Sequence, residues 1–260
     1  MRENPSRRHG EEDNYLMSSK KDKSEYLPSF FEGIAHRGLH GNGVSENSLE
    51  AFRRAIEIGS AFELDIHLTK DNELVVCHDS ELKRVTGKEG VIEDLTLEEI
   101  SSYRLLDGQK IPTFQEVLDL NQERSLIVVE LKVYKDNYKP LRKKAMEALS
   151  QIKDSKKIVL ISFDPRALLH IGKRFKRQLL ICEGHDWTWK LRGFYDSLDL
   201  QASMAKRKEV IAYRKKGGIV NVWTIETMEQ AKEYAPYVDT ITYQYADPKE
   251  IKELLKSKQQ

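Results

Sequence analysis

The sequence has little cysteine and no excess of either charge sign, and each absence excludes a class of protein. Its two cysteines, Cys77 and Cys182, supply neither a disulfide framework nor zinc-ligand spacing, so we expect a reduced intracellular compartment and a packing role for both. Lysine and arginine total 43 against 42 for aspartate and glutamate, which argues against nucleic acid or an anionic membrane as the main partner. The expected ligand is therefore a small molecule.

Long apolar runs are also missing. No segment approaches the roughly 18 consecutive apolar residues of a membrane span, and the N-terminus lacks the apolar stretch of a signal peptide. We therefore expect a cytoplasmic protein without stable membrane anchoring, and no pattern indicates an oligomeric state. Residues 1–27 are polar and charged with almost no apolar periodicity, which predicts a disordered tail. Residues 28–260 suit a single α/β barrel domain.

From residue 28 onward, short apolar runs alternate with amphipathic helical patterns. The segment GIAHRG at 33–38 predicts a first strand. The segment at 47–59 predicts a helix, with Asn47 and Glu50 as its N-cap and capping-box pair and Gly59 as its stop. Together they form a strand-helix unit.

The second predicted strand, at 62–69, turns back into an antiparallel return at 74–79, because the connection is too short for a parallel crossover. A polar excursion over 81–116 follows. Further apolar runs predict six more strands, at 125–132, 157–163, 178–184, 197–203, 218–225 and 239–246. Helical patterns are predicted at 113–122, 140–152, 165–175, 208–217 and 227–237.

Without the hairpin return, the predicted strands number eight. Near-continuous apolar strands alternating with helices indicate a parallel sheet covered on both faces, and eight such units indicate closure. The expected fold is a single (β/α)8 TIM barrel, with a β-hairpin and a short excursion after the second strand.

A polar constellation lies near the carboxyl ends of two of these strands. Glu63 and Asp65 alternate along the second strand and so share one face, and the same alternation places Glu130 and Lys132 together. Because the active site of a barrel lies at this end, the three carboxylates predict a site for a hard divalent cation, Mg²⁺ or Ca²⁺. Structural salt bridges with Lys132 and Arg37 are the alternative that the spacing leaves open.

Two histidines reach the same rim of the predicted barrel. His36 ends the first strand and His78 ends the hairpin return, and an unperturbed pKa of about 6.5 suits imidazoles to general acid and base catalysis. Arg37 and Lys132 add cationic donors for the oxygens of a phosphate. A dyad of Cys77 with His78 is rejected, because neighbours on an extended strand point to opposite faces. Together these residues predict phosphoryl transfer.

The same residues lie in motifs that resemble those of the glycerophosphodiester phosphodiesterase family. AHRG, SENS, ELDIHLTKDN, VVCHD, VELK and VWTI occur in the family's order between Ala35 and Ile225. The resemblance implies a barrel of the phosphatidylinositol-phospholipase-C-like kind. It also implies metal-dependent hydrolysis of glycerophosphodiesters to glycerol 3-phosphate and an alcohol. A lysophospholipase D and a non-catalytic phosphodiester-binding barrel are the alternatives.

The resemblance further implies a role for each matched residue. The roles are catalytic for His36 and His78, metal-ligating for Glu63, Asp65 and Glu130, and phosphate-binding for Arg37 and Lys132. Glu46 matches a family glutamate that contacts the metal, the glycerol hydroxyls or only Arg37. Trp223 matches an aromatic residue that lines the glycerol or alcohol pocket, with packing as the alternative. Which histidine is the base stays open, as does the nucleophile, which is water or a glycerol hydroxyl.

The chain departs from the family pattern near its C-terminus. Where the family usually has T-D-x-P, this chain has Tyr243, Gln244, Tyr245 and Ala246, so the shape of the last barrel loop and the leaving-group preference are in question. HDWTW at 185–189 follows a predicted strand. We expect its two tryptophans either to contact an alkyl or choline group or to pack in the core.

Overall fold

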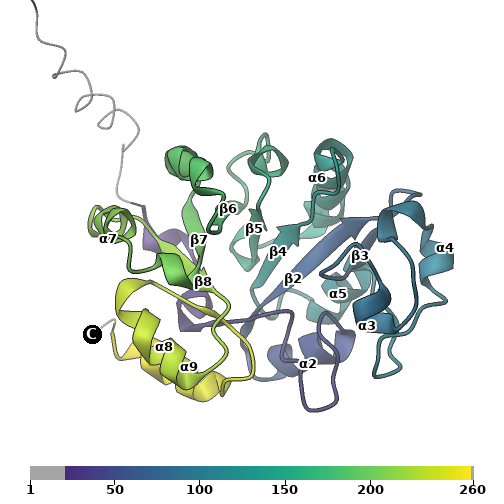
Figure 1. The fold of residues 1–260 in the computed structure, drawn as a ribbon, viewed down its shortest axis with the longest axis horizontal. Coiled ribbons are helices and arrows are strands. Elements are labelled where there is room, and N and C mark those ends of the chain that lie inside the picture. The colour runs from purple at the N-terminus through teal and green to yellow at the C-terminus, as the bar shows by residue number, and fades with distance from the viewer. Residues whose placement is uncertain (1–20, 259–260) are drawn as a thin grey trace, which may run out of the picture.

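The computed structural model describes residues 21–258, and these form a nearly closed parallel barrel surrounded by helices (Figure 1). Within these residues the strand order is β8-β7-β6-β5-β4-β2-β1-β9, and β3 pairs with β2 outside this path. The strands are β1 (Ile34–Ala35), β2 (Ala61–Leu68), β3 (Leu74–Val76), β4 (Ile127–Leu131), β5 (Ile158–Ser162), β6 (Lys176–Ile181), β7 (Ser197–Gln201), β8 (Val220–Trp223) and β9 (Thr242–Tyr243). A parallel bridge between Ile225 and Tyr243 links β8 to β9. The predicted TIM barrel with its hairpin is confirmed.

Helices follow most of the strands and cover the outside of the barrel. Their bounds are α2 (Leu49–Glu57), α3 (Lys83–Thr86), α4 (Leu97–Ile100), α5 (Phe114–Asn121), α6 (Tyr138–Ala148), α7 (Lys208–Lys215), α8 (Met228–Tyr234) and α9 (Pro248–Lys256). The predicted excursion after β3 contains α3 and α4, whereas α9 is a helix beyond those predicted. Within residues 21–258, no helix combines the length and the apolar content that crossing a membrane requires.

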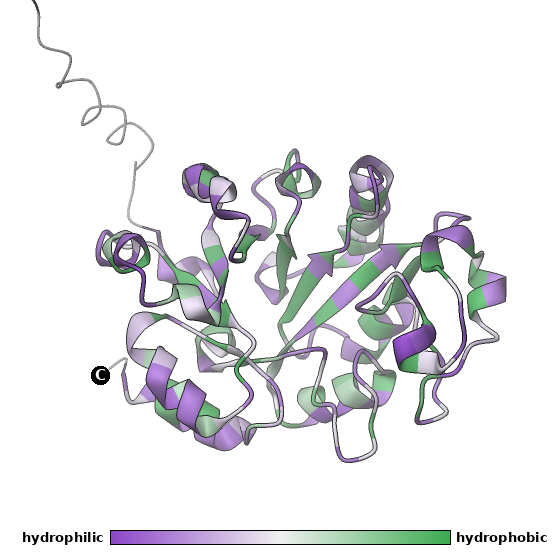
Figure 2. Cartoon of the chain, in the orientation of Figure 1, coloured by the Kyte–Doolittle hydropathy of each residue, from purple (hydrophilic) through white to green (hydrophobic). Residues whose placement is uncertain are grey.

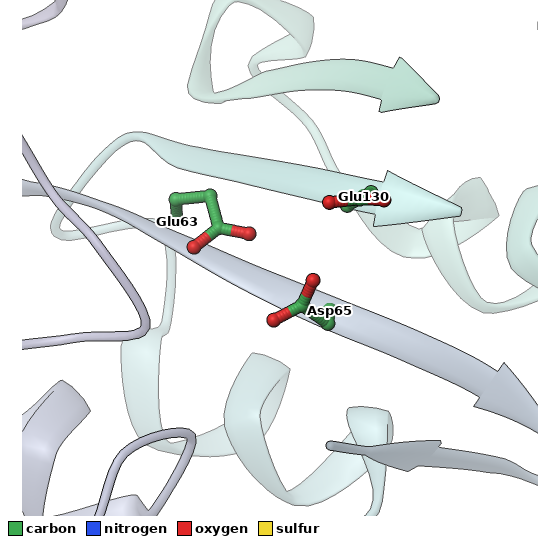
Figure 3. A group of neighbouring side chains, drawn as sticks. All are labelled: Glu63, Asp65 and Glu130. Atoms are coloured by element: carbon green, nitrogen blue, oxygen red, sulfur yellow. The ribbon is translucent and has the colours of Figure 1, made fainter. Parts of the chain in front are cut away.

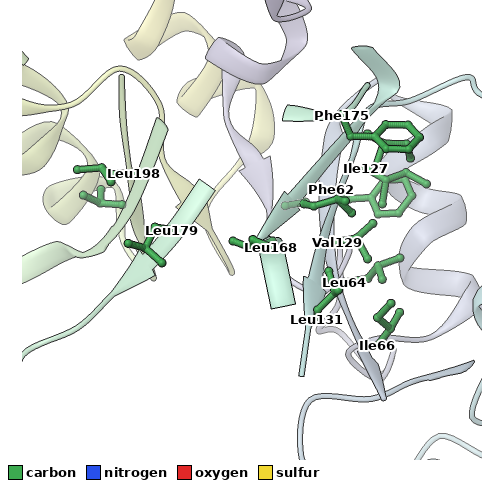
Figure 4. Packing of buried hydrophobic residues seen from close by; sticks show 14 of the residues in the cluster. Phe62, Leu64, Ile66, Ile127, Val129, Leu131, Leu168, Phe175, Leu179 and Leu198 are labelled. Carbon is green, nitrogen blue, oxygen red and sulfur yellow. The ribbon is translucent and has the colours of Figure 1, made fainter. Parts of the chain in front are cut away.

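Strand β2 separates the apolar layer from the polar interior by simple alternation. Phe62, Leu64 and Ile66 face outward and pack with residues of β4 such as Ile127 and Val129 against the surrounding helices (Figure 4). Figure 2 shows hydrophobic and hydrophilic residues alternating along this strand. Because successive strand residues point to opposite faces, the intervening acidic residues face the barrel interior.

The other end of the barrel is closed by an aromatic cluster. Tyr26, Phe30 and Phe31 are buried together with residues from the N-terminal ends of the strands, such as Ile34 and Ala61. Phe30 and Phe31 lie on the 3-10 segment η3 (Pro28–Glu32), which packs against α9. Since this end is filled with apolar side chains, only the carboxyl end is free to carry a polar site.

The predicted polar tail is wrong for its last residues. Lys23–Glu25 form the 3-10 turn η2, and Tyr26 is 6% exposed, with its hydroxyl 2.8 Å from that of Ser197. The buried aromatic ring of Tyr26 stabilises this segment, although the charged residues around it in the sequence suggest a disordered tail. Residues 1–20 lie outside the described residues.

Two local predictions also differ from the structure. The helix predicted at 165–175 is reduced to the 3-10 segment η7 (Pro165–Leu168), because His170 and Gly172 take left-handed backbone conformations that a helix cannot continue through. The N-cap of α2 is Ser48, whose hydroxyl accepts a hydrogen bond from the Ala51 amide, and not Asn47. Asn47 also has a positive φ of 53°, which turns its side chain toward β2.

Candidate active site

Three buried carboxylates lie together inside the carboxyl end of the barrel (Figure 3). Glu63 and Asp65 come from β2 and Glu130 comes from β4, and one oxygen of each lies within 4.8 Å of the others. The parallel register pairs Asp65 with Glu130, which places their side chains on the same interior face. Their exposed fractions are 3%, 1% and 7%.

The cations beside this acidic cluster neutralise its negative charge only in part, and the pKa values of the three carboxyl groups reflect this. Burial, reinforced by Asp65 and Glu130, raises the pKa of Glu63 well above its usual value. Burial also raises the pKa of Glu130 to about 7, although Lys132 opposes the shift. Burial acts in the same direction on Asp65, but Lys132, His78 and Arg37 outweigh it and its pKa is lowered. An all-oxygen donor set of this charge fits a hard divalent cation, whose binding would hold the group ionised.

Arg37 reaches the cluster because the chain turns sharply after β1. Arg37 and Gly38 both have positive φ, and a Cβ on Gly38 would lie 2.8 Å from the Ala51 backbone, so only glycine fits there. The turn directs the Arg37 amide to donate to Glu63 Oε2 at 2.9 Å. Its guanidinium lies 3.7 Å from Asp65 and donates to Glu46 at 2.8 Å.

Lys132 is the second cation beside the cluster. Its Nζ lies 3.0 Å from Glu130 Oε1 and 3.5 Å from Asp65 Oδ1. Burial would lower the pKa of Lys132, but the two carboxylates raise it instead. Arg37 and Lys132 therefore remain charged, and they approach different oxygens of Asp65, so an anionic group beside it would find two donors.

His36 follows β1 and is held by a neutral side chain. Its Nδ1 lies 2.9 Å from Gln244 Oε1, and the Gln244 amide nitrogen donates to Glu226 at 2.7 Å. Burial, with Arg37 adding to it, lowers the pKa of His36 to about 4. The residues that replace the family's T-D-x-P thus include the direct partner of His36.

His78 follows β3 and is held by a carboxylate. Its Nδ1 lies 2.6 Å from Asp79 Oδ1, and Arg84 pairs with both Asp79 and Glu46. Burial lowers the pKa of His78, while Asp65 and Asp79 oppose that shift. His67, on β2, lies 3.1 Å from the carbonyl oxygen of His78 and so helps to position its backbone.

The two imidazoles and two of the carboxylates line one small cavity of about 90 Å³. A larger cleft of about 710 Å³ shares His78, Glu130 and Phe163 with it and continues to Trp187. Of the two tryptophans in HDWTW, Trp187 is 59% exposed beside this cleft, whereas Trp189 packs on Tyr213 in the core.

Trp223 contacts both the small cavity and the core. It lines the small cavity, and it also packs on the aromatic cluster that closes the barrel. Its ring meets Phe163 edge to face, with centroids 5.6 Å apart, and its indole nitrogen donates to the Asp199 carbonyl at 3.4 Å.

Several residues at the site escaped the sequence prediction. Asn47 donates to Asp65 at 2.8 Å, and its place in the SENS motif was the only signal for it. Gln244, Glu226, Asp79, Arg84 and His67 hold the histidines or their neighbours, and Asp199 lines the small cavity. Asp79 lies within the VVCHD motif beside His78, so its place in that motif would have found it.

Fold and site together define a TIM-barrel protein with a candidate metal centre and two histidines at the carboxyl end of the barrel. The model of the Glycerophosphoryl diester phosphodiesterase family matches residues 36–247. The chain belongs to this family.

Individual relatives agree with this assignment. A glycerophosphodiester phosphodiesterase of Caldanaerobacter subterraneus is 36% identical over 149 residues, which cover 54% of this chain and 61% of that protein. Human lysophospholipase D GDPD1 is 38% identical over 116 residues, covering 44% of this chain and 32% of that protein. The chain thus spans about three fifths of the length of the bacterial relative and a third of the human one.

Solved structures match over a greater length. A glycerophosphodiester phosphodiesterase from Parabacteroides distasonis has a TM-score of 0.74 at 28% identity and covers 87% of this chain and 97% of its own. An Oleispira antarctica phosphodiesterase, solved with the product sn-glycerol-3-phosphate, has a TM-score of 0.76 at 24% identity and covers 86% of this chain and 96% of its own. The latter likeness shows the shared fold.

Proposed function

We propose that the protein hydrolyses glycerophosphodiesters to glycerol 3-phosphate and an alcohol, with a divalent cation and two histidines. The observation that carries the proposal is the buried acidic cluster of Glu63, Asp65 and Glu130, which lies beside both imidazoles. These three carboxylates would hold Mg²⁺ or Ca²⁺. When bound, such an ion stabilises the negative charge that develops on the phosphoryl oxygens. Arg37 and Lys132 orient the phosphate by donating to its remaining oxygens.

His36 serves as the general base in this proposal. A carboxylate only accepts hydrogen bonds, so Glu226 takes the Gln244 amino group and leaves the amide oxygen facing His36. His36 therefore carries its proton on Nδ1, and Nε2 keeps its lone pair. The lowered pKa of His36, about 4, keeps the ring neutral near pH 7. Nε2 can then take the proton of the nucleophile, which is water or a glycerol hydroxyl.

His78 serves as the general acid. Asp79 accepts a hydrogen bond from Nδ1 and stabilises the imidazolium form, which must be present to protonate the departing alcohol. His78 lines both the small cavity and the larger cleft, whereas His36 lines only the small cavity. The alcohol therefore leaves on the side of the larger cleft, opposite the base.

Chelation followed by metal addition tests the proposed function. After EDTA treatment and dialysis, we expect release of glycerol 3-phosphate from glycerophosphocholine to fall to background and to return with Mg²⁺ or Ca²⁺. Glu63→Gln and Glu130→Gln should not recover, because each removes a charged ligand. Undiminished turnover in the chelated protein would overturn the metal requirement, and metal-loaded protein without turnover would leave only a binding barrel.

A lysophospholipase D activity is the second candidate. It is supported by the likeness to human lysophospholipase D GDPD1 and by the exposed apolar rings of Phe163 and Trp187 along the larger cleft. Comparing kcat/KM for glycerophosphocholine and lysophosphatidylcholine separates the two. A preference for the acylated substrate that Trp187→Ala removes would favour this second candidate.

A further inference from the structure

Asp199 is a buried acidic residue that the proposed mechanism does not use. It lies on β7, which is four strands from β2 in the sheet order, and its side chain is 2% exposed. Its Oδ1 is buried and has no hydrogen-bond partner among residues 21–258. Buried polar atoms normally form hydrogen bonds, so an unpaired carboxyl oxygen next to this cavity suggests that a bound ligand supplies the missing hydrogen bond.

Asp199 borders the small cavity, so a ligand bound there could supply this hydrogen bond. Asp199 lines the small cavity together with His36, Glu63 and Trp223. Within the described part of the chain, it does not belong to the cluster of metal-ligating oxygens. It lines the small cavity and not the larger cleft, so a group held in the small cavity would contact it.

The two spaces around the phosphate site differ in size in a way that matches the two halves of the substrate. The small cavity measures about 90 Å³ and the larger cleft about 710 Å³. In a glycerophosphodiester the glycerol is small, constant and carries hydroxyl groups, whereas the alcohol varies in size. The small cavity fits the glycerol, and the cleft beside Trp187 fits the alcohol.

We propose that Asp199 hydrogen-bonds a hydroxyl group of the glycerol moiety and so selects glycerol over an alkyl group at this position. The inference rests on the proposed function. A hydroxyl donates one hydrogen bond and accepts two, and either protonation state of Asp199 can accept from it. Burial raises the pKa of Asp199 to about 8, with Glu130 adding to the shift and a hydrogen bond with the Asn221 side chain opposing it, so near neutral pH the carboxyl can also donate.

A binding experiment on metal-loaded protein tests this selection without requiring turnover. Calorimetric titration with glycerol 3-phosphate and with propyl phosphate, which lacks both hydroxyls, gives the affinity ratio for each variant. We expect wild type to bind glycerol 3-phosphate roughly 10-fold or more tightly than propyl phosphate. With propyl phosphate bound, the Asp199 carboxyl would have no hydroxyl to pair with. Asp199→Ala should lose most of this preference, and Asp199→Asn should keep part of it, since an amide also hydrogen-bonds.

Trp187→Ala is the matched control, because it alters the larger cleft and should keep the preference for the hydroxyls. Asp199→Leu, whose side chain has the same branching and number of heavy atoms, replaces Asp199→Ala if thermal melting shows that the alanine variant is unfolded. A wild-type preference that survives in both apolar variants overturns the inference, and so does a wild type without preference. Failure of the proposed function is read separately, as absent hydrolysis of glycerophosphocholine by the metal-loaded wild type.

Discussion

His36 and His78 have the same side chain but different hydrogen-bond partners. His36 faces the oxygen of an amide whose amino group is already engaged by Glu226, and burial beside Arg37 favours its neutral form. His78 faces the carboxylate of Asp79, which favours the charged form. In the proposed mechanism, the partner of each imidazole, and not the residue type, therefore decides which histidine is the base and which is the acid.

Removing each imidazole gives the largest expected effect and the sharpest test of this comparison. His36→Ala and His78→Ala should each lower kcat on glycerophosphocholine by roughly 10²–10⁴-fold. With a p-nitrophenyl phosphodiester, whose leaving group needs no proton, His78→Ala should recover most of its activity and His36→Ala should not. Steady-state release of each alcohol measures this difference.

The exposed His170 supplies the control for both variants, since His170→Ala removes an imidazole on the loop after η7. It should behave as wild type on both substrates. Equal recovery of the two catalytic-site variants on the p-nitrophenyl substrate would contradict the division into base and acid.

Replacing the carboxylate partner should have the next largest effect. Asp79→Asn keeps an oxygen that accepts from His78 Nδ1 but removes the negative charge that stabilises the imidazolium. The pKa of His78 should therefore fall further, and the alkaline limb of kcat/KM should move to lower pH. A loss of about one pKa unit corresponds to roughly 10-fold lower activity on that limb. An unmoved alkaline limb would show that Asp79 only positions the ring.

The sequence predicted the acidic side of the site better than the support of the histidines. Glu63, Asp65 and Glu130 follow from two-residue alternation on strands that neighbour each other in the sheet. Gln244 meets His36 only because β9 pairs with β1 across 208 positions of sequence, a contact that no local pattern contains. The same limitation applies to Asp199, which reaches the cavity through closure of the barrel.

Local sequence patterns also failed where several structures satisfy the same spacing. Leu168, Ile171 and Phe175 are spaced like the apolar face of a helix, and all three are buried, but the 3-10 segment η7 and the loop after it present them to the core. The apolar spacing predicts which residues are buried but does not determine the backbone conformation. Residues in the left-handed region, such as His170, end the helix here.

Changing the partner of His36 should have a smaller effect at neutral pH. Gln244→Glu places a carboxylate beside His36 and should raise its pKa from about 4. Because the base must be unprotonated, the acidic limb of kcat/KM should move to higher pH, with less than about 3-fold change at pH 7.5. Gln244→Ala, which adds no charge, should leave the limb near its original position. A Gln244→Glu profile that matches wild type would mean that His36 is not the titrating base.

Arg84 offers the smallest change, and it tests whether the two sides act independently. Its guanidinium pairs with Asp79 on the His78 side and with Glu46, the partner of Arg37, on the His36 side. The Arg84 side chain is 49% exposed, and exposed ion pairs contribute only about 0–1 kcal/mol, so Arg84→Ala should lower kcat by no more than about 5-fold.

Arg53 on α2 is the control for this variant, because it is similarly exposed and forms ion pairs with Glu50 and Glu57 away from the site. Both alanine variants should lose similar, small amounts of unfolding free energy in urea, while only Arg84→Ala should change kcat. If Arg84→Ala instead shifts both limbs of the pH profile, the ion pairs couple the two histidines. Their protonation states would then be set jointly, and the division between a base and an acid would depend on the whole network of ion pairs.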